Sequence, residues 1–557
     1  MRQMISAGVP HRLRQRLLQS SLGLGLGTGL VSLPALALSS SVGPAGIDAL
    51  RLHGAPYFLT GRKIAIGQVE IGRPSVFGLD KVAYEDMPVD VSRVFYLDDL
   101  ADPNQYVDGH AANVASVMVS QDKALTGVAP NAALFSAAVG PIRGRSAQPD
   151  ECLASQQVAL SNGGDVRAMN FSFGEPLRRD PRPNPVLDGN ALLTQCIDWS
   201  ERVHDILYVV AGNQGGGGIP IPTDNFNGIN VAYSREADGL YRKVDFANLS
   251  SEPDARSRSL PFLETNVGPR RSISLVAPGS RLELLDPDGR IRTASGTSFA
   301  SPHVAATVAL LQEWGDRQLR ADTPHWSLDA REPMVMKAVL LNSADKLKDS
   351  GDGLRLGMGR TLVDEGNRSW IESDAYRDRT IPLHAELGTG HLNAYRAYQQ
   401  FNGGQWLPGA PVPVMGWAYG AVESPLPPTD LPRAQAAILH QDYVFETPLQ
   451  ANSYISATLA WERQVVLNDD NGNERYDIGE SFEDRGLNNL DLYLLPAEAE
   501  DLSQAIWSSE SAVDSVEHLF FEIPATARYK LRVVYRQRVT DDIVQPYGLA
   551  WWAVAAR

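Results

Sequence analysis

Cysteine is nearly absent from this chain, which has only Cys152 and Cys196 among its 557 residues. Two cysteines allow one intramolecular disulfide at most. Each lies in a helix-like stretch, CLASQQVAL or NALLTQCIDW, so a disulfide formed in an oxidising compartment would join two neighbouring helices. Two buried free thiols are the alternative that the sequence leaves open.

Positive charge is also in deficit, because 50 Lys and Arg residues stand against 66 Asp and Glu residues, for a formal net charge of −16. Such a chain is repelled by phosphate backbones, which argues against nucleic-acid binding. A hydrophobic content of 43% with 21% charged residues is ordinary for a globular protein and excludes global disorder. The length predicts two or more domains.

A long apolar run occurs only near the N-terminus. Four arginines precede LLQSSLGLGLGTGLVSLPALA, which ends in a small-x-small pattern at Ala37. This pattern predicts a secretory signal over residues 1–37, followed by a short N-terminal segment over 38–60. Cleavage there leaves 46 basic against 66 acidic residues, a net charge of about −20.

A transmembrane anchor is the alternative for this run, but its glycines and Pro34 disfavour it. No cysteine lies nearby for a lipid anchor, and no later stretch is long and apolar enough to span a bilayer. We therefore expect a secreted protein, periplasmic or extracellular, with no stable membrane insertion after removal of the signal.

Residues 61–401 alternate between apolar strand-like runs and helix-like segments. KIAIGQVE, AALFSAAV, VRAMNFSFG and ILYVVAGN are candidate strands, and HAANVASVMVS and SPHVAATVALLQEW are candidate helices. This alternation predicts a parallel sheet covered by helices on both faces. Because sites in such folds collect at the carboxyl ends of the strands, Glu70, Gly174 and Asn213 should lie near the chemistry.

The composition and the hydrophobic pattern of the sequence change after residue 401. Residues 402–434 are rich in proline and glycine and are predicted to form a linker. Residues 435–557 contain short alternating segments such as YISATLAWE and YKLRVVYR, which predict an all-β sandwich domain.

The stretch TASGTSFASPHVAATVALL, residues 293–311, carries the strongest chemical signal. Ser298 follows a tight turn at Gly296 and begins a helix that is apolar nearly all round. A serine there faces unpaired backbone N–H groups and the positive end of the helix dipole. An attacking oxygen and a developing oxyanion could both be stabilised at that point.

GTSFASPHVA closely resembles the serine motif of the subtilisin-like serine proteases. In DGHAANVASVM, His110 opens a small-residue helix as the histidine of that family does, and VVAGNQGGGG carries Asn213 at the position of the family's oxyanion-hole asparagine. The segments follow in the family's order of acid, histidine and serine. The resemblance implies a subtilisin-like parallel sheet flanked by helices over most of 61–401, followed by the β-sandwich.

The resemblance also implies the roles of the residues. Ser298 would be the nucleophile, His110 the general base and Asn213 an oxyanion donor in a monomeric serine endopeptidase acting on proteins or peptides. MNFSFG resembles the strand whose backbone pairs with the substrate. The implied substrate-binding residues are Ser172, Phe173, Gly174 and Gly212.

The acidic member departs from the family pattern. Glu70-Ile71-Gly72 stands where the family has an aspartate, a small residue and glycine. Glu70 retains the charge that the imidazolium needs, but its extra methylene requires a shift of ~1 Å. We predict that Glu70 pairs with His110; Asp80 is a weaker candidate. A catalytically inactive peptide-binding homologue and an adhesive protein acting through its sandwich are the alternative functions.

DDNGNERYDIGE, residues 469–480, spaces oxygen ligands as an EF-hand loop does. It predicts a structural Ca²⁺ site, whereas a polar loop between two strands is the alternative. The predicted ligands are Asp469, Asn471, Asn473, the Arg475 carbonyl, Asp477 and Glu480.

Overall fold

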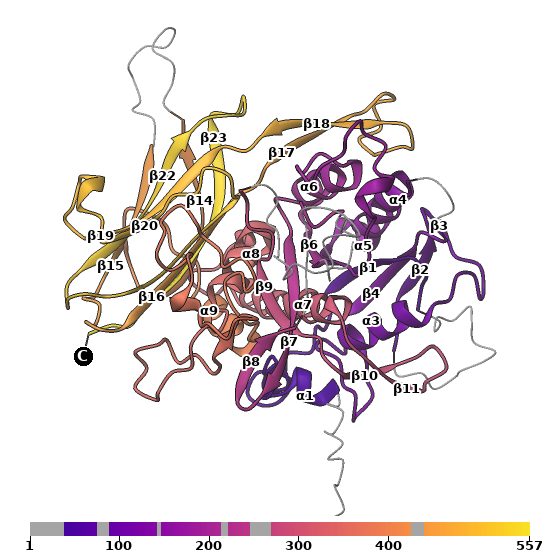
Figure 1. Cartoon of the computed structure of the whole chain (residues 1–557), viewed down its shortest axis with the longest axis horizontal. Coiled ribbons are helices and arrows are strands. Elements are labelled where there is room, and N and C mark those ends of the chain that lie inside the picture. Colours follow the sequence, from indigo (N-terminus) through magenta and orange to yellow (C-terminus); the bar gives the residue numbers. More distant parts are fainter. Residues whose placement is uncertain are drawn as a thin grey trace, which may run out of the picture. The chain divides into compact units, whose positions relative to one another are not determined.

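The computed structural model describes residues 38–74, 89–141, 146–212, 221–244, 269–424 and 439–556, and a ten-stranded sheet forms its main layer (Figure 1). Its strands are β1 (Ala65–Glu70), β2 (Arg93–Tyr96), β3 (Asp99–Leu100), β4 (Ala133–Ala138), β5 (Val166–Phe171), β6 (Leu207–Ala211), β7 (Ile229–Ala237), β8 (Leu240–Lys243), β9 (Leu275–Pro278) and β12 (Leu362–Val363). Strands β2-β4-β1-β5-β6-β7-β9 run parallel in this order. The predicted parallel sheet is confirmed.

Helices cover both faces of this sheet because its strands are apolar on both sides. Along β1, Ile66 packs into the core beneath α3 (Gly109–Val119) and α7 (Thr297–Arg320). Val69, which points the other way, packs with residues of α4 (Gln148–Ala159) and α6 (Leu192–His204). Glu70 and Phe171 end adjacent strands, so both lie at the carboxyl edge of the sheet.

The remaining helices and strands of this part flank the sheet. These are α5 (Ser161–Gly164), α8 (Pro333–Asn342), α9 (Ala394–Asn402) and the antiparallel pair β10 (Leu282–Leu285) and β11 (Ile291–Ala294). None of the helices in the described ranges is long and apolar enough to cross a membrane. The predicted signal, residues 1–37, lies outside those ranges.

The segment 38–60 is part of the core. It forms α1 (Leu38–Val42) and α2 (Leu50–His53), and the side chains of Val42, Ile47 and Leu52 are fully buried. The Tyr241 hydroxyl donates to the carbonyl of Ala45, which ties the segment to β8. The protein therefore needs these residues to complete its hydrophobic core.

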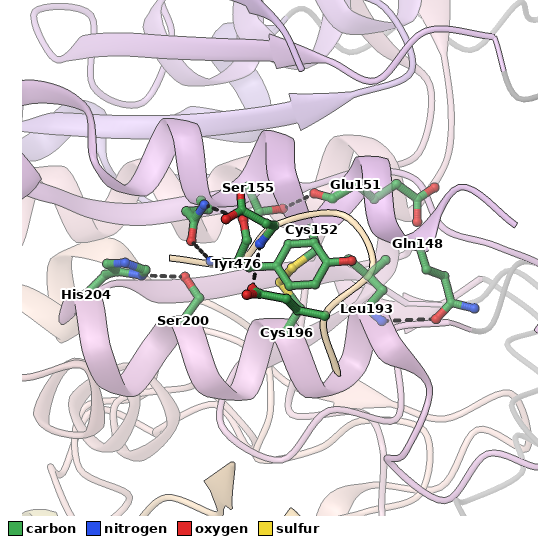
Figure 2. Close-up of a disulfide and its surroundings, with 12 residues drawn as sticks. Gln148, Glu151, Cys152, Ser155, Leu193, Cys196, Ser200, His204 and Tyr476 are labelled. Atoms are coloured by element: carbon green, nitrogen blue, oxygen red, sulfur yellow. Dashed lines mark hydrogen bonds between the residues drawn. A yellow bond between two sulfur atoms is a disulfide. The ribbon is translucent and has the colours of Figure 1, made fainter. Parts of the chain in front are cut away.

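Cys152 and Cys196 form a disulfide that joins α4 to α6 (Figure 2). Both cysteines are fully buried in an apolar cluster with Trp199 and Phe482. The disulfide interpretation of the sequence is thus confirmed, and the free-thiol alternative is wrong.

Two mainly antiparallel sheets form the C-terminal sandwich, with a shared core that includes Tyr443, Leu492 and Trp551. One sheet contains β13 (Pro411–Val412), β15 (His440–Phe445), β22 (Tyr529–Gln537), β19 (Asn489–Pro496) and β20 (Trp507–Ser509). The other contains β14 (Met415–Glu423), β23 (Val544–Trp552), β16 (Tyr454–Ala460) and β21 (Val516–Glu522).

The predicted linker at 402–434 differs from the structure in its first half. Strand β14 pairs along its whole length with β23, and β13 is the edge strand of the other sheet. The glycines of this run serve close packing, since a Cβ at Gly416 would lie 2.9 Å from the Trp551 ring and one at Gly420 2.6 Å from Tyr547. Residues 425–434 lie outside the described ranges.

A two-stranded hairpin, which we call the arm, extends from the sandwich to the disulfide-linked helices (Figure 1). It consists of β17 (Gln464–Asn468) and β18 (Ser481–Gly486) with the loop between them. The Gln156 side chain of α4 donates to the Tyr476 carbonyl at 3.1 Å and accepts from the Tyr476 N–H at 2.6 Å. Figure 2 shows the Tyr476 ring lying over the disulfide between α4 and α6.

Candidate active site

Strand β1 and helix α3 bring an acid and a histidine together. Asp108 caps α3 by accepting the Ala111 N–H, which starts the helix with His110 in its first turn. Gly72 allows the chain after β1 to pass close to this cap, because a Cβ at residue 72 would lie 2.3 Å from the Asp108 Cβ. The glycine of the Glu-Ile-Gly stretch is therefore needed for the approach of the two segments.

Glu70 and His110 form a pair in which the acid is buried and the histidine is partly exposed. The His110 Nδ1 lies 3.1 Å from the Glu70 Oε2, and the side chain of Glu70 is 2% exposed whereas that of His110 is 40% exposed. Burial raises the pKa of Glu70, while the neighbouring His110 opposes this rise. The Glu70 carboxylate in turn raises the pKa of His110 against the effect of burial.

This geometry fixes the tautomer that the neutral imidazole favours. A proton on Nδ1 is donated to Glu70, so Nε2 is left as an acceptor. The second carboxylate oxygen, Oε1, is buried without a hydrogen-bond partner. The longer glutamate side chain thus reaches the histidine through one oxygen only.

Ser298 is the second residue of α7 and is nearly buried. Its hydroxyl donates to the Ser172 carbonyl at 3.2 Å, and the Thr297 hydroxyl donates to the Gly212 carbonyl at 2.7 Å. The next residue, Phe299, has its ring centroid 5.6 Å from that of His110. The predicted serine, histidine and substrate segments therefore meet at the N-terminus of α7.

A polar network lies beneath the first turn of α7 and was not predicted from the sequence. Ser301 donates to the Asn170 side chain at 2.8 Å, and Ser172 donates to the Ser298 carbonyl at 2.9 Å. Asn170 is an uncharged polar residue inside the fully buried strand β5, which is the signal that could have revealed it. These bonds fix the start of α7 against the predicted substrate segment.

Of the remaining predicted site residues, some lie in the described part of the chain and others do not. Phe173 is buried and its ring stacks on Phe171, and Gly174 follows it without a side chain. Asn213 and Asp80 lie outside the described residues. His303, five residues after Ser298 on the same helix, forms hydrogen bonds with the Ser41 hydroxyl and the Phe299 carbonyl, and burial lowers the pKa of His303 to about 4.

The loop of the arm contains the predicted calcium ligands, which bond mainly to one another. Asp469 accepts backbone N–H groups of Gly472 and Glu474, and Asp477 accepts the side-chain amides of Asn471 and Asn473. Within the described residues, no group of three or more acidic, histidine or cysteine side chains is arranged to hold a metal ion. The donor types suit Ca²⁺, but the observed arrangement is that of a self-bonded polar loop.

A parallel α/β sheet that carries an acid, a histidine and a serine in the first turn of a helix, in this chain order, is typical of one class of serine peptidases. A sequence profile of the subtilase family matches residues 30–359. The chain belongs to the subtilase family of serine endopeptidases.

Several characterised proteins are similar to this chain. Subtilisin of Bacillus pumilus is 25% identical over 296 residues, which is 51% of this chain and 90% of that protein. The intracellular serine protease of Paenibacillus polymyxa is 25% identical over 46% of this chain and 70% of its own length. The alkaline protease of Alkalihalobacillus alcalophilus is 23% identical over 38% of this chain, and the match spans only 48% of that relative.

Among solved structures, a cold adapted subtilisin-like serine proteinase aligns with 55% of this chain and 89% of its own, at 19% identity and a TM-score of 0.35.

Proposed function

We propose that this protein is an active serine endopeptidase that cleaves protein or peptide substrates with Ser298, His110 and Glu70. The observation that carries the proposal is the 3.1 Å hydrogen bond between His110 Nδ1 and the buried carboxylate of Glu70. His110 lies on α3, next to the first turn of α7 that carries Ser298. A buried, unsolvated carboxylate is costly unless it is paired, and a catalytic imidazolium is the partner that needs its charge.

In the proposed mechanism, the Ser298 hydroxyl leaves its bond to the Ser172 carbonyl and passes its proton to His110 Nε2 while Oγ attacks the substrate carbonyl. Glu70 stabilises the imidazolium that forms. The tetrahedral oxyanion is held by the Ser298 N–H and the Asn213 side chain, where loss of one such donor costs ~3–4 kcal/mol. His110 then gives the proton to the leaving amine, and water hydrolyses the acyl-enzyme by the reverse sequence.

Covalent labelling of the nucleophile distinguishes an active enzyme from an inactive peptide-binding homologue. A fluorophosphonate probe should label the wild-type protein at Ser298, and Ser298→Ala should abolish labelling. Ser295→Ala, which removes an exposed serine three residues earlier, is the matched control and should label normally. Folded wild-type protein that does not react with the probe would overturn the proposal.

We also propose that the protein is secreted and acts as a monomer. The buried disulfide supports an oxidising compartment, because such bonds rarely persist in the cytosol. Ca²⁺ binding by the loop of the arm belongs to the same proposal. It would require Asp477 to exchange its two amide donors for the cation, with Asp469, Glu480 and the amide oxygens as further ligands.

A further inference from the structure

A cavity of about 580 Å³ lies where four segments of the chain meet. Its walls come from the N-terminal segment around α2, the loop 353–359, the first turns of α9 and the end of β23. Glu70, His110 and Ser298 do not line it. The volume falls within the range of about 300–1,000 Å³ that is usual for small-molecule sites.

The loop 353–359 forms a wall with little side-chain bulk. Gly353, Gly357 and Gly359 line the cavity, and a Cβ added at Gly353 or Gly357 would meet no atom within 4 Å. The Asp349 carboxylate accepts the N–H groups of these two glycines, at 3.0 and 3.1 Å. The open space is therefore held by the fold of the loop itself.

Arg396, in the first turn of α9, contributes a buried cation with a spare donor. It is 2% exposed, and its Nε and Nη1 donate to the carbonyls of Ser343 and Leu356, whereas Nη2 has no hydrogen-bond partner. Burial lowers the pKa of Arg396 to about 10, so the guanidinium keeps its charge at neutral pH. Its acidic neighbour, Asp345 at 3.2 Å, also pairs with Arg360 at 2.7 Å, so one carboxylate serves two guanidinium groups.

Asp48 contributes a buried acceptor to the same cavity. It is 8% exposed, and its Oδ1 has no hydrogen-bond partner, while Oδ2 lies 3.5 Å from the Arg51 Nε. The Ala394 N–H donates to the Ile47 carbonyl at 2.7 Å, which brings Asp48 beside the first turn of α9. Buried polar atoms rarely lack a partner. Here one cavity is lined by a cation and an anion that each have one.

We propose that this cavity binds a free amino acid or a short peptide, with the ligand's carboxylate on Arg396 and its ammonium group on Asp48. The charged residues of the lining are Asp48, Arg51 and Arg396, so the lining has one positive charge in excess and favours a ligand that carries a carboxylate. A guanidinium donates to a carboxylate through charge-assisted hydrogen bonds, and an ammonium group supplies the donor that Asp48 Oδ1 lacks.

Binding requires one side chain to move. Arg51 lies against Asp48, and the Arg396 guanidinium lies 4.2 Å from the centroid of the Trp552 ring, so both unpartnered atoms are covered in the observed structure. The Arg51 side chain is 52% exposed and is the part of this cover that can turn toward solvent. Its guanidinium then becomes a second donor to the ligand's carboxylate.

Other classes of ligand satisfy the cavity less well. An inorganic anion leaves Asp48 Oδ1 without a donor, and a metal cation is repelled by the two arginines of the lining. A zwitterion supplies both missing partners in one molecule. The inference does not rest on the proposed protease function, because the lining contains none of the proposed catalytic residues.

The test is calorimetric titration and thermal unfolding of the full chain carrying Ser298→Ala, which prevents hydrolysis of the ligand. The probes are the dipeptide alanyl-leucine, its C-terminal amide and its N-acetyl form. The dipeptide should bind saturably and raise Tm, and each form that lacks one charge should bind at least about tenfold more weakly. Because Arg396 also bonds two carbonyls of the fold, the amide tests its role from the side of the ligand.

Asp48→Asn tests the other end of the ligand. Asp48 has a φ of 58°, a conformation that asparagine adopts readily, so the variant should fold normally. It should weaken binding of the dipeptide about tenfold and change binding of the N-acetyl form little. Asp238→Asn is the matched control, because Asp238 is exposed, has a φ of 57° and lies outside the cavity; it should bind as the parent does.

Three results would overturn the inference. The first is no saturable binding of the dipeptide at concentrations up to about 10 mM. The second is equal binding of all three forms, or of the dipeptide to Asp48→Asn and its parent. The third is equal stabilisation by acetate alone, which would identify a simple anion site. Probe labelling of the wild-type protein reports separately on the proposed protease function, so failure of one proposal is distinguished from failure of the other.

Discussion

Replacement of Glu70 by glutamine tests the central ion pair with almost no change of shape. In the native protein, Glu70 Oε2 accepts from His110 Nδ1 at 3.1 Å, and Oε1 has no partner. The glutamine amide can turn either end toward His110. If the NH₂ group faces Nδ1, the ring proton moves to Nε2, which can no longer accept the proton of Ser298. If the oxygen faces Nδ1, the amide N–H groups stay buried without acceptors, at a cost of about 1–3 kcal/mol.

Either orientation removes the negative charge that stabilises the imidazolium. A triad acid changed to its amide typically costs about 10⁴-fold in kcat, and we expect a loss of this order for Glu70→Gln. Glu70→Asp retains the charge but shortens the side chain by one carbon–carbon bond of about 1.5 Å. The 3.1 Å contact then opens beyond hydrogen-bond distance unless β1 moves, so we expect a loss of about 100-fold.

The pH profile separates a catalytic loss from a structural one. His110 acts as a base only when neutral, and Glu70 raises the pKa of His110, so wild-type kcat/KM should rise with pH through a value above 6.5, the ordinary pKa of histidine. In Glu70→Gln the pKa of His110 falls, and this acidic limb should move to lower pH. The assay is hydrolysis of a fluorogenic peptide from pH 5 to 9, with Asp99→Asn, an exposed carboxylate on β3, as the control. Activity of Glu70→Gln within about tenfold of wild type, with an unmoved limb, would refute the reasoning.

Three further predictions concern stability. Burial raises the pKa of Glu462 from 4.5 to about 7. The contribution of the neutral carboxyl to the unfolding free energy is therefore fully present below pH 4.5, declines as the pH rises and is lost above pH 7. Glu462→Gln should therefore stabilise the protein by up to about 3 kcal/mol at pH 8 and by almost nothing at pH 4.5, as measured by denaturant unfolding. Reduction of the Cys152–Cys196 disulfide, whose cysteines are 44 residues apart, should lower the unfolding free energy by about 4 kcal/mol. Saturating Ca²⁺ should raise Tm, and the combined change of Asp469→Asn and Asp477→Asn should abolish that rise.

The outcomes that contradict these predictions are equally specific. An equal effect of Glu462→Gln at both pH values would show that Glu462 ionises normally in the folded protein. An unchanged unfolding curve after complete reduction would mean that the arm and its apolar contacts alone hold α4 to α6. A Tm that is the same in Ca²⁺ and in EDTA would establish the loop 469–480 as a polar connection between β17 and β18.

Several features could be predicted because their signals are local. The apolar runs that end at Glu70 and Phe171 are long enough to require burial on both faces, and that fixes a parallel sheet with helices. The stretch around Ser298 combines a tight turn, a proline in the first helical turn and an apolar helix, which together position the serine. The pairing of Glu70 with His110 followed from the cost of a buried carboxylate and the need of a helix-borne imidazole for an anion.

The linker could not be predicted in full because proline and glycine have two structural uses. Gly416 and Gly420 fall in the run predicted to form a linker, whereas they lie in a strand whose partner side chains, Trp551 and Tyr547, leave no room for a Cβ. Pro411 lies in the edge strand β13, where a missing N–H is tolerated. The residue types are the same in a linker and in such a strand, and only the neighbouring chain distinguishes them.

By itself, the sequence determined the subtilase fold, the order of its chemical groups and the identity of the acid beside His110, because these depend on contiguous patterns. The tertiary structure alone decided that the arm reaches back from the sandwich to α4, where Gln156 bonds both backbone groups of Tyr476 across 320 residues. It also decided that Asp48 and Arg396, far apart in the sequence, line one cavity and that each has a buried atom without a partner. Burial and the absence of a partner are properties of the whole packed chain, since any distant residue could have supplied the missing bond.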